Sequence, residues 1–195
     1  PITVNGREQV VLSSGRAYKG VDPASGKELW EHAWTTSYGV NAADPVLSGT
    51  KLFVSSGYNK GCALLELASA EPQELWRNRL MKNQFNSSVL IEGHLYGIDG
   101  DENKTAVLKC LEFETGTEKW AEPSTGFGAL MAADGKLIII TAKGELVIAK
   151  ASAEKFEVIS RNQVLEGRCW SAPVLANGKL YVRNAAGKML CLAVD

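Results

Sequence analysis

The sequence has few cysteines, no long apolar run and no excess of one charge, and each shortage excludes a class of protein. Its four cysteines, Cys62, Cys110, Cys169 and Cys191, lack the Cys-x-x-Cys spacing of a redox or zinc motif. No stretch approaches the roughly 20 apolar residues of a membrane span. The 21 Lys and Arg residues offset 22 Asp and Glu residues. We therefore expect no membrane span and no nucleic-acid partner.

The cysteines and the two histidines fit structural positions better than catalytic ones. Two of the cysteines occupy the same position in different repeats, which favours small apolar residues on buried strands over a disulfide framework. The histidines, His32 and His94, fall in different repeats. Neither a zinc cluster nor a Ser-His-Asp arrangement can be assembled from them.

Glycine turns followed by β-forming runs recur through the whole chain. The runs are NGREQVVLSS, SGTKLFVSSG, EGHLYGIDG, DGKLIIITAKG and NGKLYVRNAAG, and their turn glycines are spaced by 43, 44, 42 and 43 residues. Such turns between β-forming runs indicate antiparallel hairpins. In the second repeat the pattern predicts strands near 42–47, 51–55, 63–67 and 74–79. Four short strands in each period predict one blade of a β-propeller.

The predicted fold class is all-β, a β-propeller of four-stranded antiparallel blades in a single domain, 1–195. The last repeat stops after its third strand, so the count is about four and three-quarter blades. We expect the missing strand upstream of Pro1, in a larger protein of which this is the C-terminal part. A self-contained five-bladed ring and an oligomerised half-ring are the alternatives, and open edges favour self-association. The predicted blades are 1–34, 35–80, 81–124, 125–166 and 167–195.

A tryptophan follows a Ser-Gly or Thr-Gly turn in VDPASGKELW and LEFETGTEKW. A glycine there can adopt the positive φ of a turn between third and fourth strands, and Asp22 or Glu112 can tie that turn by hydrogen bonds. The ring can pack on the neighbouring blade while its indole N–H reaches a backbone carbonyl. We expect these residues to be structural staples between blades: Gly26, Trp30, Trp76, Gly116 and Trp120.

This pattern resembles the tryptophan-docking motif of the pyrroloquinoline-quinone (PQQ)-like β-propeller repeat family. Two of the four complete repeats fit it closely, the second keeps only Trp76, and the fourth has Ile159 or Ser160 in place of the tryptophan. The resemblance implies one of two functions. Some members are quinoprotein dehydrogenases that hold PQQ and Ca²⁺. Others, BamB-like, lack the cofactor and offer an interaction surface in the bacterial periplasm or cell envelope.

The residues that a quinoprotein site would need are scarce in this segment. The resemblance implies a pair of adjacent cysteines, and no two cysteines are adjacent. It also implies an Asp base on an innermost strand, where Asp44 is the candidate, although a strand-end residue before Pro45 is the simpler interpretation. A calcium loop is suggested by the spacing in IDGDENK, but Lys104 stands where such a loop needs Gly. We expect no cofactor and no metal in this segment.

The segments that lead into the predicted innermost strands are SYGVNAADPV, MKNQFNSSVL and GRCWSAPVL. Innermost strands line the channel of a propeller, where a ligand pocket is common. Amide, cationic and aromatic groups there suit a carboxylated or sugar-like ligand. The alternative is that Asn41 and Asn86 only satisfy backbone groups near the axis. The candidate ligand-binding residues are Tyr38, Asn41, Lys82, Asn83, Asn86, Arg168 and Trp170.

Three functions remain open from the sequence. The first is a non-catalytic scaffold or binding domain in the bacterial envelope, with a protein or small ligand as partner. The second is a fragment of a PQQ-dependent oxidoreductase acting on an alcohol or sugar. The third is a sensor that binds a ligand at the channel mouth.

Overall fold

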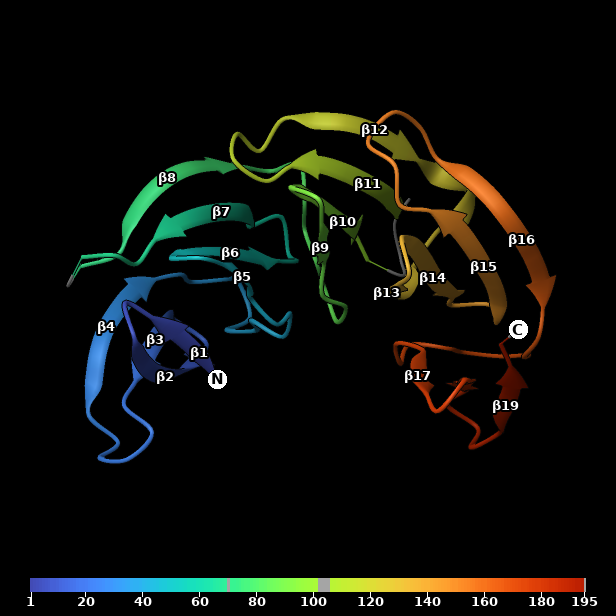
Figure 1. Ribbon diagram of the computed structural model, residues 1–195, viewed down its shortest axis with the longest axis horizontal. Coiled ribbons are helices and arrows are strands. Elements are labelled where there is room, and N and C mark those ends of the chain that lie inside the picture. The colour runs from blue at the N-terminus through green and yellow to red at the C-terminus, as the bar shows by residue number, and fades with distance from the viewer. Residues whose placement is uncertain (70, 102–105, 195) are drawn as a thin grey trace.

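The computed structural model of the protein describes residues 1–69, 71–101 and 106–194. In this part of the chain every regular element is a β-strand except one short 3-10 helix, η1 (Pro123–Thr125). The strands form five antiparallel sheets, each pairing its strands in sequence order. Figure 1 shows the sheets side by side in an open arc, with the first strand of each on the concave side. The predicted all-β propeller architecture is confirmed.

The five sheets are numbered as blades in chain order. Blade 1 contains β1 (Ile2–Val4), β2 (Arg7–Ser13), β3 (Ala17–Val21) and β4 (Glu28–Ala33). Blade 2 contains β5 (Val46–Ser48), β6 (Lys51–Ser56), β7 (Gly61–Glu66) and β8 (Gln73–Asn78). Blade 3 contains β9 (Val89–Ile91), β10 (His94–Asp99), β11 (Val107–Glu112) and β12 (Glu118–Glu122). Blade 4 contains β13 (Gly128–Ala133), β14 (Lys136–Thr141), β15 (Glu145–Lys150) and β16 (Glu157–Gln163). Blade 5 has three strands, β17 (Val174–Ala176), β18 (Lys179–Arg183) and β19 (Met189–Ala193).

The glycine turns that revealed the repeat join the first two strands of each blade. In blade 1 the register places Val4 opposite Arg7, so Asn5 and Gly6 form a two-residue turn, and both have positive φ. Blade 3 repeats this geometry with Glu92 in the left-handed region, which a glutamate seldom adopts. Such turns match the twist of paired strands and so fix the register of each hairpin.

The first strand of blade 2 is shorter than predicted. The expected strand began at residue 42, whereas β5 begins at Val46. Two features of the preceding segment account for the difference. The backbone N–H of Asp44 donates to Ser87 Oγ of the next connection at 2.8 Å, and Pro45 has no N–H to give to a sheet. The segment therefore links two blades instead of extending one.

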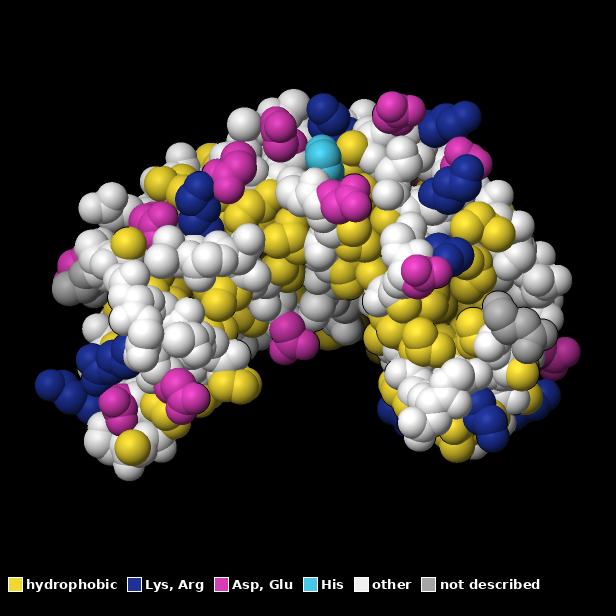
Figure 2. Space-filling view, viewed as in Figure 1, with side chains coloured by type: hydrophobic (Ala, Val, Ile, Leu, Met, Phe, Trp, Pro, Cys, Tyr) yellow, Lys and Arg dark blue, Asp and Glu magenta, His cyan; other side chains and the backbone are white. Residues whose placement is uncertain are grey.

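The hydrophobic core consists of four separate layers, one between each pair of neighbouring blades. Tyr18 and Trp34 pack with Leu52 and Leu65 between blades 1 and 2, and three similar clusters fill the other junctions. Each blade thus buries its faces only against its neighbours, as in other repeat proteins. The concave side of the arc stays open between blades 1 and 5 (Figures 1 and 2).

Two of the three predicted tryptophan staples bridge blades as expected. Trp76 donates its indole N–H to the backbone carbonyl of Phe113 in blade 3 at 3.1 Å. Trp120 donates to the carbonyl of Ser152 in blade 4 at 2.8 Å. A Cβ added to Gly116 would lie 2.8 Å from Trp76 Cε3. The glycine of one blade therefore receives the tryptophan of the preceding blade.

The hydrogen bond of Trp30 differs from the prediction. Its indole N–H donates to the side-chain oxygen of Gln9 at 2.7 Å, within the same sheet, and not to a backbone carbonyl of blade 2. The ring still belongs to the apolar layer between blades 1 and 2. Gly20 makes this arrangement possible, because a Cβ there would lie 2.1 Å from Trp30 Nε1.

The predicted turns before the tryptophans are confirmed. Gly26 and Gly116 have φ values of 71° and 69°. In blade 1 the carboxylate of Asp22 accepts from the backbone N–H and the hydroxyl of Ser25, both at 2.9 Å. Arg7 beside it, together with these hydrogen bonds, holds the pKa of Asp22 well below its usual range. The turn is thus closed by local polar contacts and does not depend on packing against another blade.

The cysteines are all unpaired, and three of them are buried as expected. Cys191 is exposed, so its predicted burial is wrong. It lies on β19, the outermost strand of blade 5, against which no further strand pairs in the described structure. Among the described residues no helix is long and apolar enough to cross a membrane.

Candidate binding surface

The antiparallel order of each blade divides the arc into two rims. The chain turns from the first to the second strand, and from the third to the fourth, at one rim, which we call the hairpin rim. It turns from the second to the third strand, and passes to the next blade, at the other rim, which we call the connection rim. All seven candidate ligand residues lie in connections between blades, at 34–45, 79–88 and 164–173, so they share the connection rim.

Asn41 is a buried link between blades 1 and 2. Its amide N–H₂ donates to the carbonyls of Ser14 and Trp34 at 2.6 and 2.9 Å. Its side-chain oxygen accepts from the hydroxyl of Ser56 at 2.8 Å. These three bonds use most of what the amide can offer, and they tie blade 1 to blade 2.

Asn83 is the centre of a second buried hydrogen-bond network, which lies at the start of blade 3. Its amide N–H₂ donates to Asn86 Oδ1 and to the carbonyl of Ile98, both at 3.2 Å, and its oxygen accepts from Ser88 at 2.9 Å. Asn86 is 5% exposed, and its Nδ2 has no partner in the described structure. A buried donor without a partner is costly and requires an explanation.

Trp170 is the centre of an aromatic cluster drawn from three connections. Phe85 stacks on it with ring centroids 5.6 Å apart, and Phe127 meets it edge-on at 5.9 Å. The guanidinium of Arg168 lies 4.5 Å from the centroid of the Trp170 ring. The indole nitrogen of Trp170 is buried and has no hydrogen-bond partner among the described residues. Arg168 and Trp170 are thus brought together with Phe85, close to Asn86 in the chain.

Two aromatic residues of the connection rim face solvent. Tyr38 is 74% exposed and meets Tyr58 edge-on, with ring centroids 4.8 Å apart. Phe85 is 46% exposed although it stacks on Trp170. Exposed aromatic side chains on a rigid frame are typical anchors of protein interfaces.

Lys82 belongs to an ion-pair network and not to the aromatic cluster. Its ammonium lies 3.4 Å from Asp99 Oδ1, and Lys109 lies 3.2 Å from Oδ2 of the same carboxylate. Burial alone would lower the pKa of Lys109, but Glu118 and Asp99 outweigh it and raise that pKa. Lys82 and Asp99 line a cleft of about 290 Å³ between the β6–β7 turn and blade 3.

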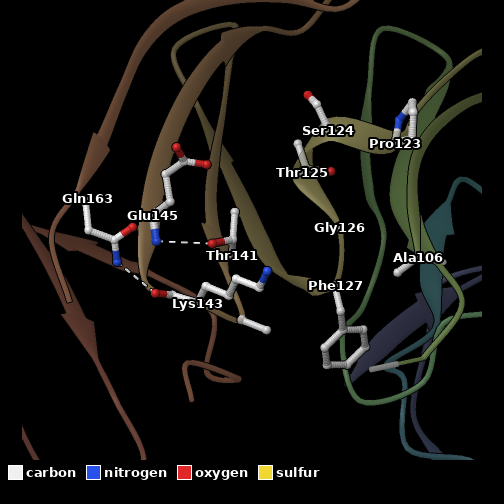
Figure 3. Close-up of a pocket in the computed structure, with 11 residues that line it drawn as sticks. Ala106, Pro123, Ser124, Thr125, Gly126, Phe127, Thr141, Lys143, Glu145 and Gln163 are labelled. Carbon is white, nitrogen blue, oxygen red and sulfur yellow. Dashed lines mark hydrogen bonds between the residues drawn. The ribbon is translucent and has the colours of Figure 1, made fainter. Parts of the chain in front are cut away.

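Another cleft on this rim, of about 560 Å³, lies between blades 3 and 4. Figure 3 shows Lys143 extending from the β14–β15 turn toward η1, whose Thr125 forms part of the opposite wall. Gln163 Nε2 donates to the carbonyl of Lys143 at 2.8 Å, and Thr141 Oγ1 accepts from the N–H of Glu145. Thr125 Oγ1 is buried without a partner in the described part of the chain.

The residues considered above for catalysis and for calcium binding, Asp44 and the segment IDGDENK, do not form a common site in the described part of the chain. Asp44 lies in the exposed connection before β5 and not on an innermost strand. Asn103 and Lys104 of IDGDENK lie outside the described residues. Within 1–69, 71–101 and 106–194, no group of three or more His, Cys, Asp or Glu side chains could hold a metal ion.

Three aromatic residues of this surface were not predicted: Tyr58, Phe85 and Phe127. Phe85 stood inside the quoted segment MKNQFNSSVL, and its place in a connection was a usable signal. Nothing in the sequence pairs it with Trp170, because the two rings are 85 positions apart and meet only through the curvature of the arc.

The fold and the rim define a β-propeller domain of PQQ-like repeats with one aromatic, polar connection rim. The chain belongs to the family described as outer membrane protein assembly factor BamB, whose profile matches residues 2–122. No curated protein sequence matches the chain significantly. The docking motif had already implied this family, and the match confirms it.

Solved structures support the fold at low sequence identity. BamB from Moraxella catarrhalis has a TM-score of 0.73 and 13% identity, covering 98% of this chain and 56% of that one. Quinohemoprotein alcohol dehydrogenase from Comamonas testosteroni has a TM-score of 0.67 and 13% identity, covering 95% and 40%. The computationally designed Ika4 protein has a TM-score of 0.60 and 11% identity, covering 87% and 99%. The chain thus spans about half the length of the BamB structure.

Proposed function

We propose that the chain is a non-catalytic PQQ-like propeller domain that binds and positions protein partners in the bacterial cell envelope. The observation that carries this proposal is that the amide side chains of the connection rim are bonded inside the protein, whereas two of its aromatic side chains are exposed. Its amides at Asn41 and Asn83 are used in hydrogen bonds within the protein, whereas Tyr38 and Phe85 present aromatic surface to solvent. The envelope location and the assembly role come from the family to which the chain belongs.

Photo-crosslinking tests the proposal directly. A photoreactive phenylalanine at Tyr38 or Phe85 of the full-length protein should give a discrete adduct with the same envelope protein from both positions. Asp134 is the matched control, because it is exposed but lies on the hairpin rim. Equal labelling from Asp134, or no adduct from either rim position, would contradict the proposal.

The oxidoreductase alternative makes a different forecast. The full-length protein should bind PQQ with Ca²⁺ and reduce a dye with an alcohol or a sugar as donor. Failure to bind PQQ would exclude that alternative and would leave the scaffold proposal standing.

A ligand sensor is the second candidate, favoured by two donors that lack partners among the described residues, Trp170 Nε1 and Asn86 Nδ2. A carboxylated or sugar-like ligand could accept hydrogen bonds from both, with Arg168 beside Trp170. Trp170→Ala and Arg168→Ala should then abolish ligand binding and leave the melting temperature within a few degrees of the parent. A large drop in melting temperature with unchanged binding would assign these residues to packing.

A further inference from the structure

A small cleft on the outer side of blade 2 is lined almost entirely by cationic and amide side chains. Its volume is about 320 Å³. It lies at the connection rim, where the β6–β7 turn meets the end of the outer strand β8. Three of its five lining residues are cationic and none is acidic: Asn59, Lys60, Arg77, Asn78 and Arg79.

One wall of this cleft is the β6–β7 turn, whose backbone adopts an unusual conformation. Tyr58 and Asn59 both have positive φ, at 52° and 61°, and Gly61 follows at 97°. Asparagine tolerates this region better than most residues. A Cβ at Gly61 would lie 2.2 Å from the carbonyl oxygen of Asn78 and 3.1 Å from Arg79 Cγ. Glycine is therefore required for Arg79 to lie so close to the turn that carries Lys60.

The positive charge of the cleft is only partly neutralised. Arg77 donates its Nε–H to Glu74 at 2.9 Å and a second bond from its terminal nitrogen to the same carboxylate. Lys60 and Arg79 form no ion pair with any carboxylate in the described part of the chain. Lys60 instead lies 4.7 Å from the centroid of the Trp34 ring, and Arg77 lies 4.9 Å from that same ring.

The cations of the cleft repel one another, and their charge adds to burial in lowering the pKa values of Lys60 and His32. Burial first and then Arg77 lower the pKa of Lys60, and Glu74 offsets this only in part. His32 lies 4.0 Å from Glu74, and burial together with Arg77 and Lys60 lowers its pKa as well. An anion in the cleft would relieve this repulsion, since an opposite charge favours the protonated form of each cation.

We propose that the cleft formed by Asn59, Lys60, Arg77 and Arg79 binds a phosphate group. Two uncompensated cations and a third shared with Glu74 match a dianion better than a single carboxylate. The planar guanidinium of Arg79 suits the oxygens of a phosphate, and Lys60 adds a point charge. The cleft shares none of its five lining residues with the aromatic side chains assigned above to protein partners.

Titration calorimetry with inorganic phosphate at low ionic strength tests the site. One phosphate should bind per chain, and Lys60→Gln and Arg79→Gln should each weaken binding by about tenfold or more, the loss of one charge-assisted contact. Glu74→Gln should strengthen binding, because it frees Arg77. Lys119→Gln is the matched control, since Lys119 is exposed on β12 in another blade and its loss changes the net charge equally.

Equal weakening by Lys119→Gln, or unchanged binding in the Lys60 and Arg79 variants, would overturn the proposal. Circular dichroism melts verify folding, and Arg79→Lys keeps the charge and should restore part of the binding if Arg79→Gln is unstable. Glycerol phosphate and vesicles of phosphatidylglycerol then distinguish the source of the phosphate group. Binding of glycerol phosphate indicates a small soluble ligand. Binding of the vesicles alone, with loss in Arg79→Gln, indicates a lipid headgroup.

Discussion

The third-to-fourth strand turns of blades 1 and 3 have the same local structure and different surroundings. Gly26 and Gly116 have nearly equal φ values, and each turn is tied by an acidic side chain to the hydroxyl before the glycine. A Cβ at Gly26 would meet nothing within 4 Å, whereas at Gly116 it would meet the ring of Trp76. The motif therefore builds the turn by itself, and only the turn of blade 3 is packed by a tryptophan from the preceding blade.

The junctions of the arc differ in the same way. Between blades 3 and 4 a tryptophan crosses to a backbone carbonyl. Between blades 4 and 5 the equivalent position, opposite Ile148, is Ser160, and the layer there consists mainly of aliphatic side chains. Aromatic junctions combine a large apolar area with one directional hydrogen bond, and aliphatic junctions rely on area alone.

The largest expected effect comes from removing the staples themselves. Trp30→Ala should lower the free energy of unfolding by about 3–5 kcal/mol, as is usual for buried aromatics, and Trp120→Ala by up to that amount because its ring is only partly buried. Ser160→Ala, at the equivalent place in blade 4, should change it by less than about 0.5 kcal/mol. Urea denaturation of the purified chain measures all three. A cost below about 1 kcal/mol for both tryptophans would refute their role as staples.

The two turn glycines allow the sharpest comparison. Gly26→Ala should cost only about 1–2 kcal/mol, the price of a left-handed alanine. Gly116→Ala should cost more, because its Cβ would lie 2.7 Å from Asn78 Nδ2 and 2.8 Å from Trp76 Cε3. Introducing Trp76→Ala alongside should bring the two glycine costs closer together. Equal costs in the parent background would show that Trp76 does not press on Gly116.

The junction between blades 1 and 2 differs from the others because its tryptophan donates to a side chain, that of Gln9. This side chain is the acceptor for Trp30, so Gln9→Leu should leave the buried indole N–H unsatisfied and cost about 1–3 kcal/mol. No side-chain substitution can remove the corresponding acceptor of Trp120, which is a backbone carbonyl. Hydrogen exchange of the two indole protons would report the change. Unchanged protection of Trp30 in the variant would contradict the assignment.

The smallest expected effect is a pH dependence at blade 2. Burial, Arg77 and Lys60 place the pKa of His32 below its usual value of 6.5, with Glu74 opposing them. The unfolded chain then binds more protons than the folded chain below pH 6.5, so the melting temperature should fall as the pH drops from 8 to 5.5. His32→Gln should flatten this slope, and His94→Gln, which leaves His32 in place, should retain it.

The repeat, the turns and the staple positions could be predicted because they depend on local chemistry. A two-residue turn such as Asn5-Gly6 needs positive φ, and glycine spacing records it directly in the sequence. The one misplaced strand, β5, and the one misjudged cysteine, Cys191, depend on neighbours. Asp44 bonds to a residue 43 positions away, and Cys191 has no adjoining strand.

The sequence groups the seven candidate ligand residues by region of the fold and not by contact. All seven residues lie on the connection rim, because antiparallel blades must return every connection to the same side. Which of them face one another was beyond the sequence. Asn41 turned out to be a buried link between blades, whereas Trp170 joined Phe85, which had not been selected.

By itself the sequence determined the blade, its period and its turns, since strand pairing within a blade joins residues that are close along the chain. Only the tertiary structure decided the acceptor of each indole, the meeting of Phe85 with Trp170, and the cationic cleft of Lys60 and Arg79. Those arrangements depend on how successive blades curve into an arc. The curvature is set by packing between blades, and no short segment of the chain records it.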